Sequence, residues 1–162
     1  MSEIQEKNSI HIKNKLDQGL SFKISRFKEQ IKRTRPHKHD EYYELIFLSE
    51  GEGFHTIESE KYLVSAPEIY FLKPGQLHYW QFTSIPKGFV IIFRDEEFNE
   101  LTDAQIIRTY TQLLGFHRLK LRETDFFQSI HELILAETQS TNPFSKATIH
   151  GLVWAMLSKI LE

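Results

Sequence analysis

Short runs of apolar and aromatic residues, broken by turn residues, fill the chain between residues 20 and 93. Each run is only four to six residues long, which favours strands over helices. The breaks hold glycine, proline or charged residues, as turns between strands do. Strands are therefore expected at seven segments: 20–24, 43–48, 53–57, 61–64, 68–72, 78–82 and 89–93.

Beyond Arg94 the apolar residues recur every three or four positions, the period of an amphipathic helix. Helices are expected over residues 95–114, 123–138 and 143–161, so this tail is predicted to be entirely helical. Thr124-Asp125 and Asn142-Pro143 serve as helix start signals, the second with proline at the first helical position. The first helix is predicted to bury Phe98 and Leu101 among its apolar residues.

The last predicted helix carries an apolar stripe that we expect to pair with its copy in a two-fold dimer. Packing of this stripe on the barrel or on the preceding helix is the alternative. The stripe consists of Ile149, Leu152, Val153, Met156, Leu157 and Ile160. The apolar pattern is still in register where the sequence stops, which indicates a chain cut from a longer protein, although a natural helix can end there too.

Seven strands without intervening helices indicate an antiparallel sandwich or barrel. A chain of 162 residues has room for one domain with a substantial core. We therefore divide it into a mobile, charged arm (1–19), a barrel (20–94) and a helical region (95–162).

The composition excludes several classes of function. A net charge of −2 gives no electrostatic reason for the chain to bind DNA by itself. Without cysteine there is no disulfide, no thiolate metal site and no thiol nucleophile. No secretory signal or membrane-spanning run is present, so a cytoplasmic protein without membrane contact is expected.

Two groups of residues carry candidate chemistry, and their spacing resembles the two motifs of the cupin family. The first is His37-x-His39-x4-Glu44-x6-Gly51, and the second is Pro74-Gly75-x-x-His78. The resemblance implies a mainly β fold, the cupin jelly-roll or double-stranded β-helix barrel, here followed by C-terminal helices. The second motif departs from the family pattern, since Glu68, Lys73 and Phe82 replace a glycine, a proline and an asparagine.

The cupin resemblance implies a metal site. Two histidines at i and i+2 share one face of a strand, so His37 and His39 can enter the barrel together. Glu44 and His78 would complete a set of three nitrogens and one oxygen suited to divalent iron, manganese, nickel or zinc. The alternatives are a hydrogen-bonded polar network, or a pocket for an organic ligand without metal.

The residues around these motifs resemble the N-terminal ligand-sensing domain of AraC-type transcription regulators. The resemblance rests on Arg-Pro-His-x-His-x-x-Tyr-Tyr-Glu-Leu-Ile, the Pro-Gly-x-x-His-x-Trp strand and the helical tail. It implies that Arg35 forks onto a ligand and that Trp80 stacks on a ring, in a pocket shared with His37, His39, Glu44 and His78. Surface pairing for Arg35 and core packing for Trp80 are the alternatives.

The sequence thus predicts an effector-sensing and dimerisation domain of a bacterial regulator, without catalytic residues. It would form homodimers through its helices, and its DNA-binding domain would lie outside this chain. The main alternative is a small metal-dependent cupin enzyme, a dioxygenase or isomerase; a storage or structural barrel is disfavoured by the helical tail.

Other polar residues are interpreted as ordinary surface. The remaining histidines lack ligand spacing and are expected on the surface or on helix faces: His11, His55, His117, His131 and His150. Two groups of basic residues are interpreted as the solvated face of barrel strands: Lys23, Arg26 and Lys28, then Lys32, Arg33 and Arg35.

Overall fold

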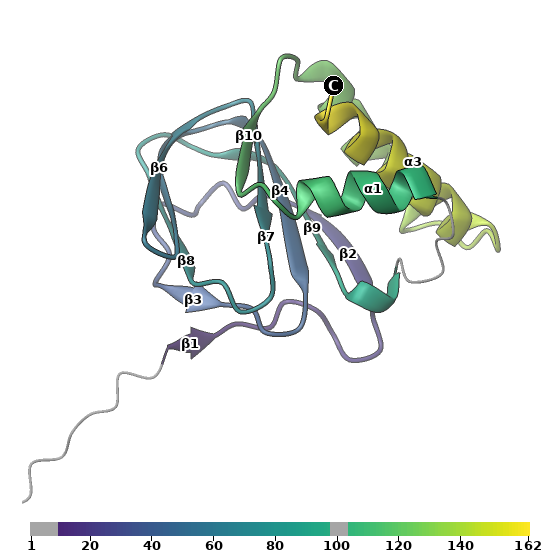
Figure 1. The fold of residues 1–162 in the computed structure, drawn as a ribbon, viewed down its shortest axis with the longest axis horizontal. Helices are drawn as coiled ribbons and strands as arrows, with labels where there is room; N and C mark the ends of the chain where they lie inside the picture. The colour runs from purple at the N-terminus through teal and green to yellow at the C-terminus, as the bar shows by residue number, and fades with distance from the viewer. Residues whose placement is uncertain (1–9, 98–103) are drawn as a thin grey trace, which may run out of the picture.

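The computed structural model describes residues 10–97 and 104–162. Two five-stranded sheets face each other, and the helices cover the outer side of one of them (Figure 1). Sheet A contains, in spatial order, β1 (His11–Ile12), β3 (His37–Lys38), β8 (His78–Phe82), β5 (Glu52–Ile57) and β6 (Glu60–Ser65). Sheet B contains β10 (Arg118–Lys120), β7 (Glu68–Leu72), β4 (Tyr43–Glu50), β9 (Lys87–Phe93) and β2 (Phe22–Arg26).

A short 3-10 helix, η1 (Asp95–Glu97), follows the last long strand. The helices are α1 (Ala104–Leu113), α2 (Asp125–Glu137) and α3 (Ser145–Ile160). A mainly β architecture with a helical tail is therefore confirmed. Within the described part of the chain, no helix has both the length and the apolar character that crossing a membrane requires.

Sheet B is buried on both faces, and the alternation of its side chains separates two cores. Leu45 and Phe47 belong to a cluster shared with the helices, whereas Ile46 and Leu48 belong to the barrel interior. Successive strand residues point to opposite faces. By the same parity Glu44 points into the barrel, in phase with Ile46.

A glycine sets the close contact between two strands of sheet A. A side chain on Gly53 would place its Cβ 2.7 Å from the Cα of Phe82, and the φ of +136° is one that glycine adopts readily. Strands β5 and β8 can therefore pair closely, with His55 opposite Trp80 in the register.

The prediction that the tail is entirely helical is wrong, because β10 lies within it. Arg118 pairs with Tyr70 and Lys120 with Glu68 at the edge of sheet B. Three residues, two of them charged, are too few to show a strand period in the sequence. The two-residue strand β1 was not expected either, whereas the strand expected at the histidine pair is present as β3, which ends at Lys38, one residue before His39.

One of the two predicted helix starts is confirmed, because α2 begins at Asp125 with Thr124 at its N-cap, and the other differs. Helix α3 begins at Ser145, so Pro143 precedes the helix instead of opening it. The Asn142 side-chain oxygen accepts a hydrogen bond from the Phe144 backbone N–H (2.9 Å), and the chain turns there before the helix starts. The predicted positions of Phe98 and Leu101 lie outside the described residues.

Part of the predicted arm packs on the barrel. Residues 1–9 lie outside the described part of the chain. Residues 10–19 contribute β1, which runs parallel to β3, and Leu16, whose side chain is buried in the barrel core. The sheets therefore extend beyond residues 20–94 at both ends, through β1 and β10.

The apolar stripe of α3 is covered within this chain, so the prediction that it forms the dimer surface is wrong. Val153, Met156 and Leu157 are buried in the cluster shared by the helices and sheet B. The alternative interpretation, packing on the barrel and the neighbouring helix, is confirmed. Other apolar side chains of the helical region are exposed: Ile107 (49%), Leu133 (57%) and Phe144 (72%).

Candidate functional site

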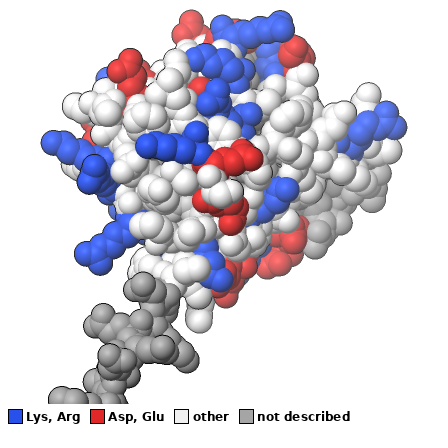
Figure 2. Space-filling view, turned by 60° about the vertical axis from the view of Figure 1, so that its left-hand side comes forward, with Lys and Arg blue, Asp and Glu red and all other residues white. Residues whose placement is uncertain are grey.

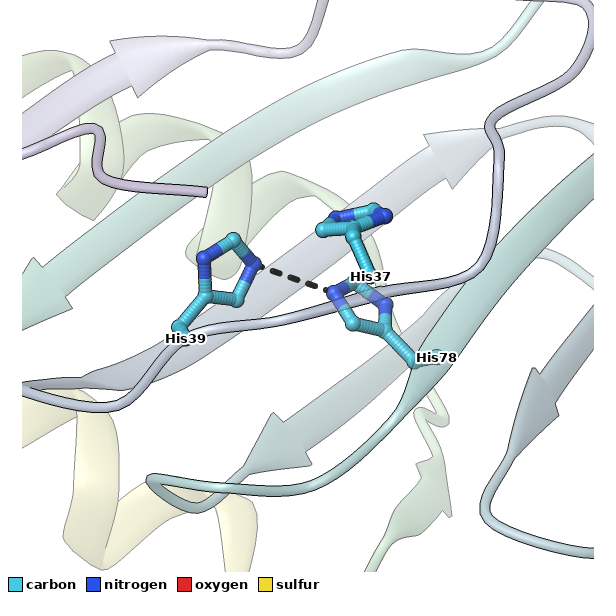
Figure 3. Close-up of side chains that lie close together, drawn as sticks. All are labelled: His37, His39 and His78. Atoms are coloured by element: carbon cyan, nitrogen blue, oxygen red, sulfur yellow. Dashed lines mark hydrogen bonds between the residues drawn. The ribbon is translucent and has the colours of Figure 1, made fainter. Parts of the chain in front are cut away.

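Three histidines converge inside the barrel. His37 lies on β3, His39 directly follows it, and His78 begins β8 opposite His37 in the register. One nitrogen from each ring lies within 4.8 Å of the others, and all three side chains are buried. Figure 3 shows the rings turned toward one another, with His39 and His78 in contact.

Glu44 joins the histidines from the opposite sheet. The chain bends at Asp40 and Glu41, which moves it from β3 of sheet A to β4 of sheet B. Glu44 is fully buried, and its Oε2 lies 3.2 Å from His39 Nε2 and 3.7 Å from His78 Nε2. The four predicted ligand residues therefore lie together.

The other oxygen of Glu44 is paired with a residue that the sequence did not single out. The Lys15 ammonium, from the segment after β1, forms an ion pair with Glu44 Oε1. Burial alone would raise the pKa of the Glu44 carboxyl, but Lys15 and His39 outweigh burial and hold this pKa below its usual range. Glu44 is therefore ionised and already has one cationic partner.

His37 presents an unpartnered nitrogen. Its Nδ1 donates a hydrogen bond to the Arg35 carbonyl (2.7 Å), which leaves a lone pair on Nε2. Burial lowers the pKa of His37 to about 4, so the ring is neutral. Among the described residues its Nε2 has no hydrogen-bond partner, although it is buried. A buried acceptor of this kind calls for a water, a metal or a ligand.

His39 and His78 admit two proton arrangements. In both of them His39 Nδ1 donates to the Lys13 carbonyl (2.8 Å) and His39 Nε2 carries a lone pair facing His78 Nε2 at 3.1 Å. With the proton on its Nε2 instead, His39 would donate a hydrogen bond to Glu44 Oε2 (3.2 Å) and its Nδ1 would accept one from the Tyr42 hydroxyl (2.7 Å). With a proton on His78 Nε2 the two rings hydrogen-bond without an ion. With the proton on His78 Nδ1, which faces His55 Nε2 at 3.0 Å, all three rings direct lone pairs to a common centre.

The second arrangement fits a divalent transition metal. Two nitrogens 3.1 Å apart match bonds of about 2.1 Å to one ion at near-octahedral angles. Burial lowers the pKa of His78 well below its usual value, which keeps the ring neutral as a ligand must be. His37, His39, His78 and Glu44 would hold the ion, which would supply Lewis-acid chemistry, but Lys15 already neutralises the carboxylate.

Trp80 packs in the barrel core and also lines its cavity. Its ring stacks on His55 (centroids 3.5 Å apart, 6° between planes) and on Phe82 (4.9 Å, 11°). The prediction that His55 lies on the surface is wrong, because this residue is fully buried. It alternates in phase with buried Ile57 on β5, a signal that was present in the sequence.

His131 lies on a helix face, as one of the two expected positions, but this face is not exposed. This residue is fully buried between the rings of Phe47 (5.0 Å) and Phe89 (5.1 Å), at the contact of α2 with sheet B. Its Nδ1 donates to the Phe127 carbonyl (2.6 Å), and burial lowers its pKa to about 4. Its spacing from Phe127 and Ile134 already matched the buried face of a helix.

A cavity of about 810 Å³ opens beside the histidine cluster. Of the predicted ligand-binding residues, Arg35, His37, His78 and Trp80 line it. His39 and Glu44 lie behind this lining, in contact with His78 and Lys15. Five of the six residues interpreted as a solvated strand face surround the cavity: Lys23, Arg26, Lys28, Arg33 and Arg35.

Comparison with known structures defines the class of fold. The chain resembles ToxT from Vibrio cholerae, solved with a bound unsaturated fatty acid, at a TM-score of 0.54 and 13% identity, over 86% of this chain and 54% of that one. A cupin protein from Bacteroides fragilis (21% identity, TM-score 0.38) covers 51% of this chain and 69% of its own length. A predicted oxalate decarboxylase from Thermotoga maritima (17%, TM-score 0.38) covers 45% and 64%.

The two facing sheets and the C-terminal helices of this structure confirm the predicted fold class, a cupin-type barrel followed by helices. The model of the AraC-like ligand binding domain matches residues 24–153, and the chain belongs to that family. The chain spans about half the length of ToxT and less than two thirds of the Thermotoga protein. A comparison with curated protein sequences gives no significant match.

Proposed function

We propose that this chain is the effector-sensing and dimerisation domain of a cytoplasmic AraC-type transcription regulator. A small molecule would bind in the barrel cavity, and DNA would be bound by a domain outside this chain. The family match supports a ligand-binding role. A net charge of −2 gives this part of the protein no attraction to DNA.

The observation that carries the proposal is the cavity itself. Its volume of about 810 Å³ falls within the range of small-molecule sites, about 300–1,000 Å³. Aromatic and aliphatic side chains form part of its lining, and polar and basic groups form the rest, among them the unpartnered His37 Nε2. This combination is typical of a site that encloses an organic ligand.

Sheet B offers a short route from the cavity to the helices. Ile46 and Val90 line the cavity, while their chain neighbours Phe47 and Phe89 contact His131 of α2 on the opposite face. A ligand that displaces β4 or β9 would therefore move the residues on which α2 rests. Such coupling requires that the ligand bind two arrangements of the sheet with different affinity.

The dimer would use the exposed apolar side chains of the helical region, because the stripe of α3 is already covered. We expect Leu133→Lys, at a side chain that is 57% exposed on α2, to weaken self-association about tenfold or more in sedimentation velocity. The matched control is Leu63→Lys on β6, whose side chain is 62% exposed. A wild-type monomer at high micromolar concentration, or equal effects of the two substitutions, would contradict dimerisation through the helices.

A second candidate function is a small metal-dependent enzyme, a dioxygenase or isomerase, that uses the same cluster. The convergence of three histidines and Glu44 favours it. The Lys15 ammonium on Glu44 opposes it, because this cation repels a metal ion from the carboxylate that should bind it.

A further inference from the structure

The lining of the cavity is strongly basic, although the chain as a whole is slightly acidic. Seven lining residues are cationic and only Asp17 is anionic; the cations are Lys13, Lys15, Lys23, Arg26, Lys28, Arg33 and Arg35. Over the whole chain, 22 acidic residues outnumber 20 basic ones, and the face in Figure 2 carries side chains of both signs. The positive charge is therefore a property of this site.

Only part of this charge is neutralised by the protein. Lys15 pairs with Glu44, and Arg26 pairs with both carboxylate oxygens of Glu132 at 2.6 Å. Across residues 10–97 and 104–162, no carboxylate forms an ion pair with five of the lining cations: Lys13, Lys23, Lys28, Arg33 and Arg35. Like charges gathered around a concave site attract an anion.

The two arginines stand on a segment that the barrel holds in place. Thr34 donates its backbone N–H to the Trp80 carbonyl (3.1 Å) and accepts the Trp80 backbone N–H on its hydroxyl (2.8 Å). Arg33, Arg35 and His37 alternate along this segment, and all three line the cavity. A guanidinium can bind a carboxylate or phosphate with two parallel hydrogen bonds.

A second part of the lining is apolar and aromatic, and the buried His37 lines the same cavity. Besides Trp80, this part consists of Phe27, Ile31, Ile46, Val90 and Ile92. His37 Nε2, on a side chain that is 3% exposed, is a buried polar atom without a partner. The lining of the cavity thus has a cationic part and an apolar, aromatic part.

We propose that the ligand of this cavity is an organic anion, with an oxyanion group bound by Arg33 and Arg35 and an apolar ring or chain against Trp80. The proposal rests on the proposed function, since it specifies the ligand of the same cavity. A sugar or other neutral polyol would leave the cations of the lining without partners. A free inorganic anion would leave the apolar part of the lining uncovered.

The test is calorimetric titration of the whole chain with four probes. They are 3-phenylpropanoate, phenyl phosphate, the neutral 3-phenyl-1-propanol and inorganic phosphate. We expect the first two to bind about tenfold or more tightly than the alcohol, the tighter one identifying the anionic group, and inorganic phosphate to bind weakly. Added salt should weaken binding of the two anions and leave binding of the alcohol unchanged.

The substitutions Arg33→Gln and Arg35→Gln, made together, should remove the preference for the anions and leave binding of the alcohol unchanged. Arg122→Gln, at an exposed arginine that does not line the cavity, is the control. Equal binding of alcohol and carboxylate, or unchanged anion affinity in the double variant, overturns the inference but leaves a cavity that binds ligands. No binding of any organic probe at millimolar concentration overturns both the inference and the proposed function.

Discussion

The Phe47→Ala variant should lose about 3–5 kcal/mol of its free energy of unfolding, as large aromatic-to-alanine changes in cores do. Phe47 is fully buried on β4, where it stacks on His131 and contacts Phe127 of α2 (ring centroids 6.0 Å). Its removal would open a cavity between sheet B and the helices, in the cluster that joins the barrel to the helical tail.

Urea denaturation followed by circular dichroism measures this loss. Phe144→Ala is the matched control, because Phe144 is 72% exposed and its truncation should change the free energy by under about 0.5 kcal/mol. Equal losses in the two variants would contradict the packing of the helices on sheet B. Loss of the helical signal alone, with the barrel still folded, would show that the two parts unfold separately.

The Lys15→Met variant should make the stability of the protein depend on zinc. Without the ammonium, Glu44 would be a buried carboxylate with no cationic partner, and we expect a loss of about 3 kcal/mol. This value lies at the low end for buried pairs because the Lys15 side chain is 30% exposed. A divalent ion bound by Glu44 and the three histidines would restore the missing charge.

At a zinc concentration of about 100 times its dissociation constant, binding to this variant should add about 2.7 kcal/mol to the free energy of unfolding. The wild-type protein should gain much less, because Lys15 repels the ion. Lys38→Met is the control, since Lys38 is equally exposed (30%) but pairs with Asp40 at 3.3 Å. Equal stabilisation of all three proteins by zinc would show that Lys15 does not compete with a metal.

The sequence predicted the barrel well because the residue composition of each long strand is typical of a strand. Runs such as 43–48 and 68–72 are rich in aromatic and branched residues, and both became central strands of sheet B. Strands β1 and β10 escaped prediction because two or three residues cannot show a period. They form by backbone pairing with strands that are distant in the sequence, as β10 does with β7.

The part of the candidate site that depends on alternation of side chains along a strand was predictable from the sequence. His37 and His39 enter the barrel together, as their spacing predicted, and the bend at Asp40 and Glu41 brings Glu44 to the same interior from the opposite sheet. The position of Lys15 could not be foreseen, because it depends on a segment without apolar periodicity crossing the barrel to reach Glu44. The sequence likewise did not predict the basic lining of the cavity, because its lysines and arginines come from separate segments of the chain.

The burial of His55 and His131 could have been foreseen from spacing. Each is in phase with buried neighbours, at strand period beside Ile57 and at helix period beside Ile134. For these two residues, spacing relative to buried neighbours indicates burial better than the polar residue type does. A core tolerates a histidine that hydrogen-bonds or stacks. His131 does both, through the Phe127 carbonyl and the ring of Phe47.

Fluorine NMR on protein labelled with 5-fluorotryptophan tests most directly whether a ligand binds inside the barrel. The chain has two tryptophans: Trp80 lines the cavity, and Trp154 lies in the core formed with the helices. On titration with 3-phenylpropanoate, the Trp80 resonance should shift and saturate with the affinity found by calorimetry, while the Trp154 resonance moves much less. The Trp154→Phe variant assigns the two signals. Calorimetric binding without a shift of the Trp80 resonance would contradict a ligand inside the barrel.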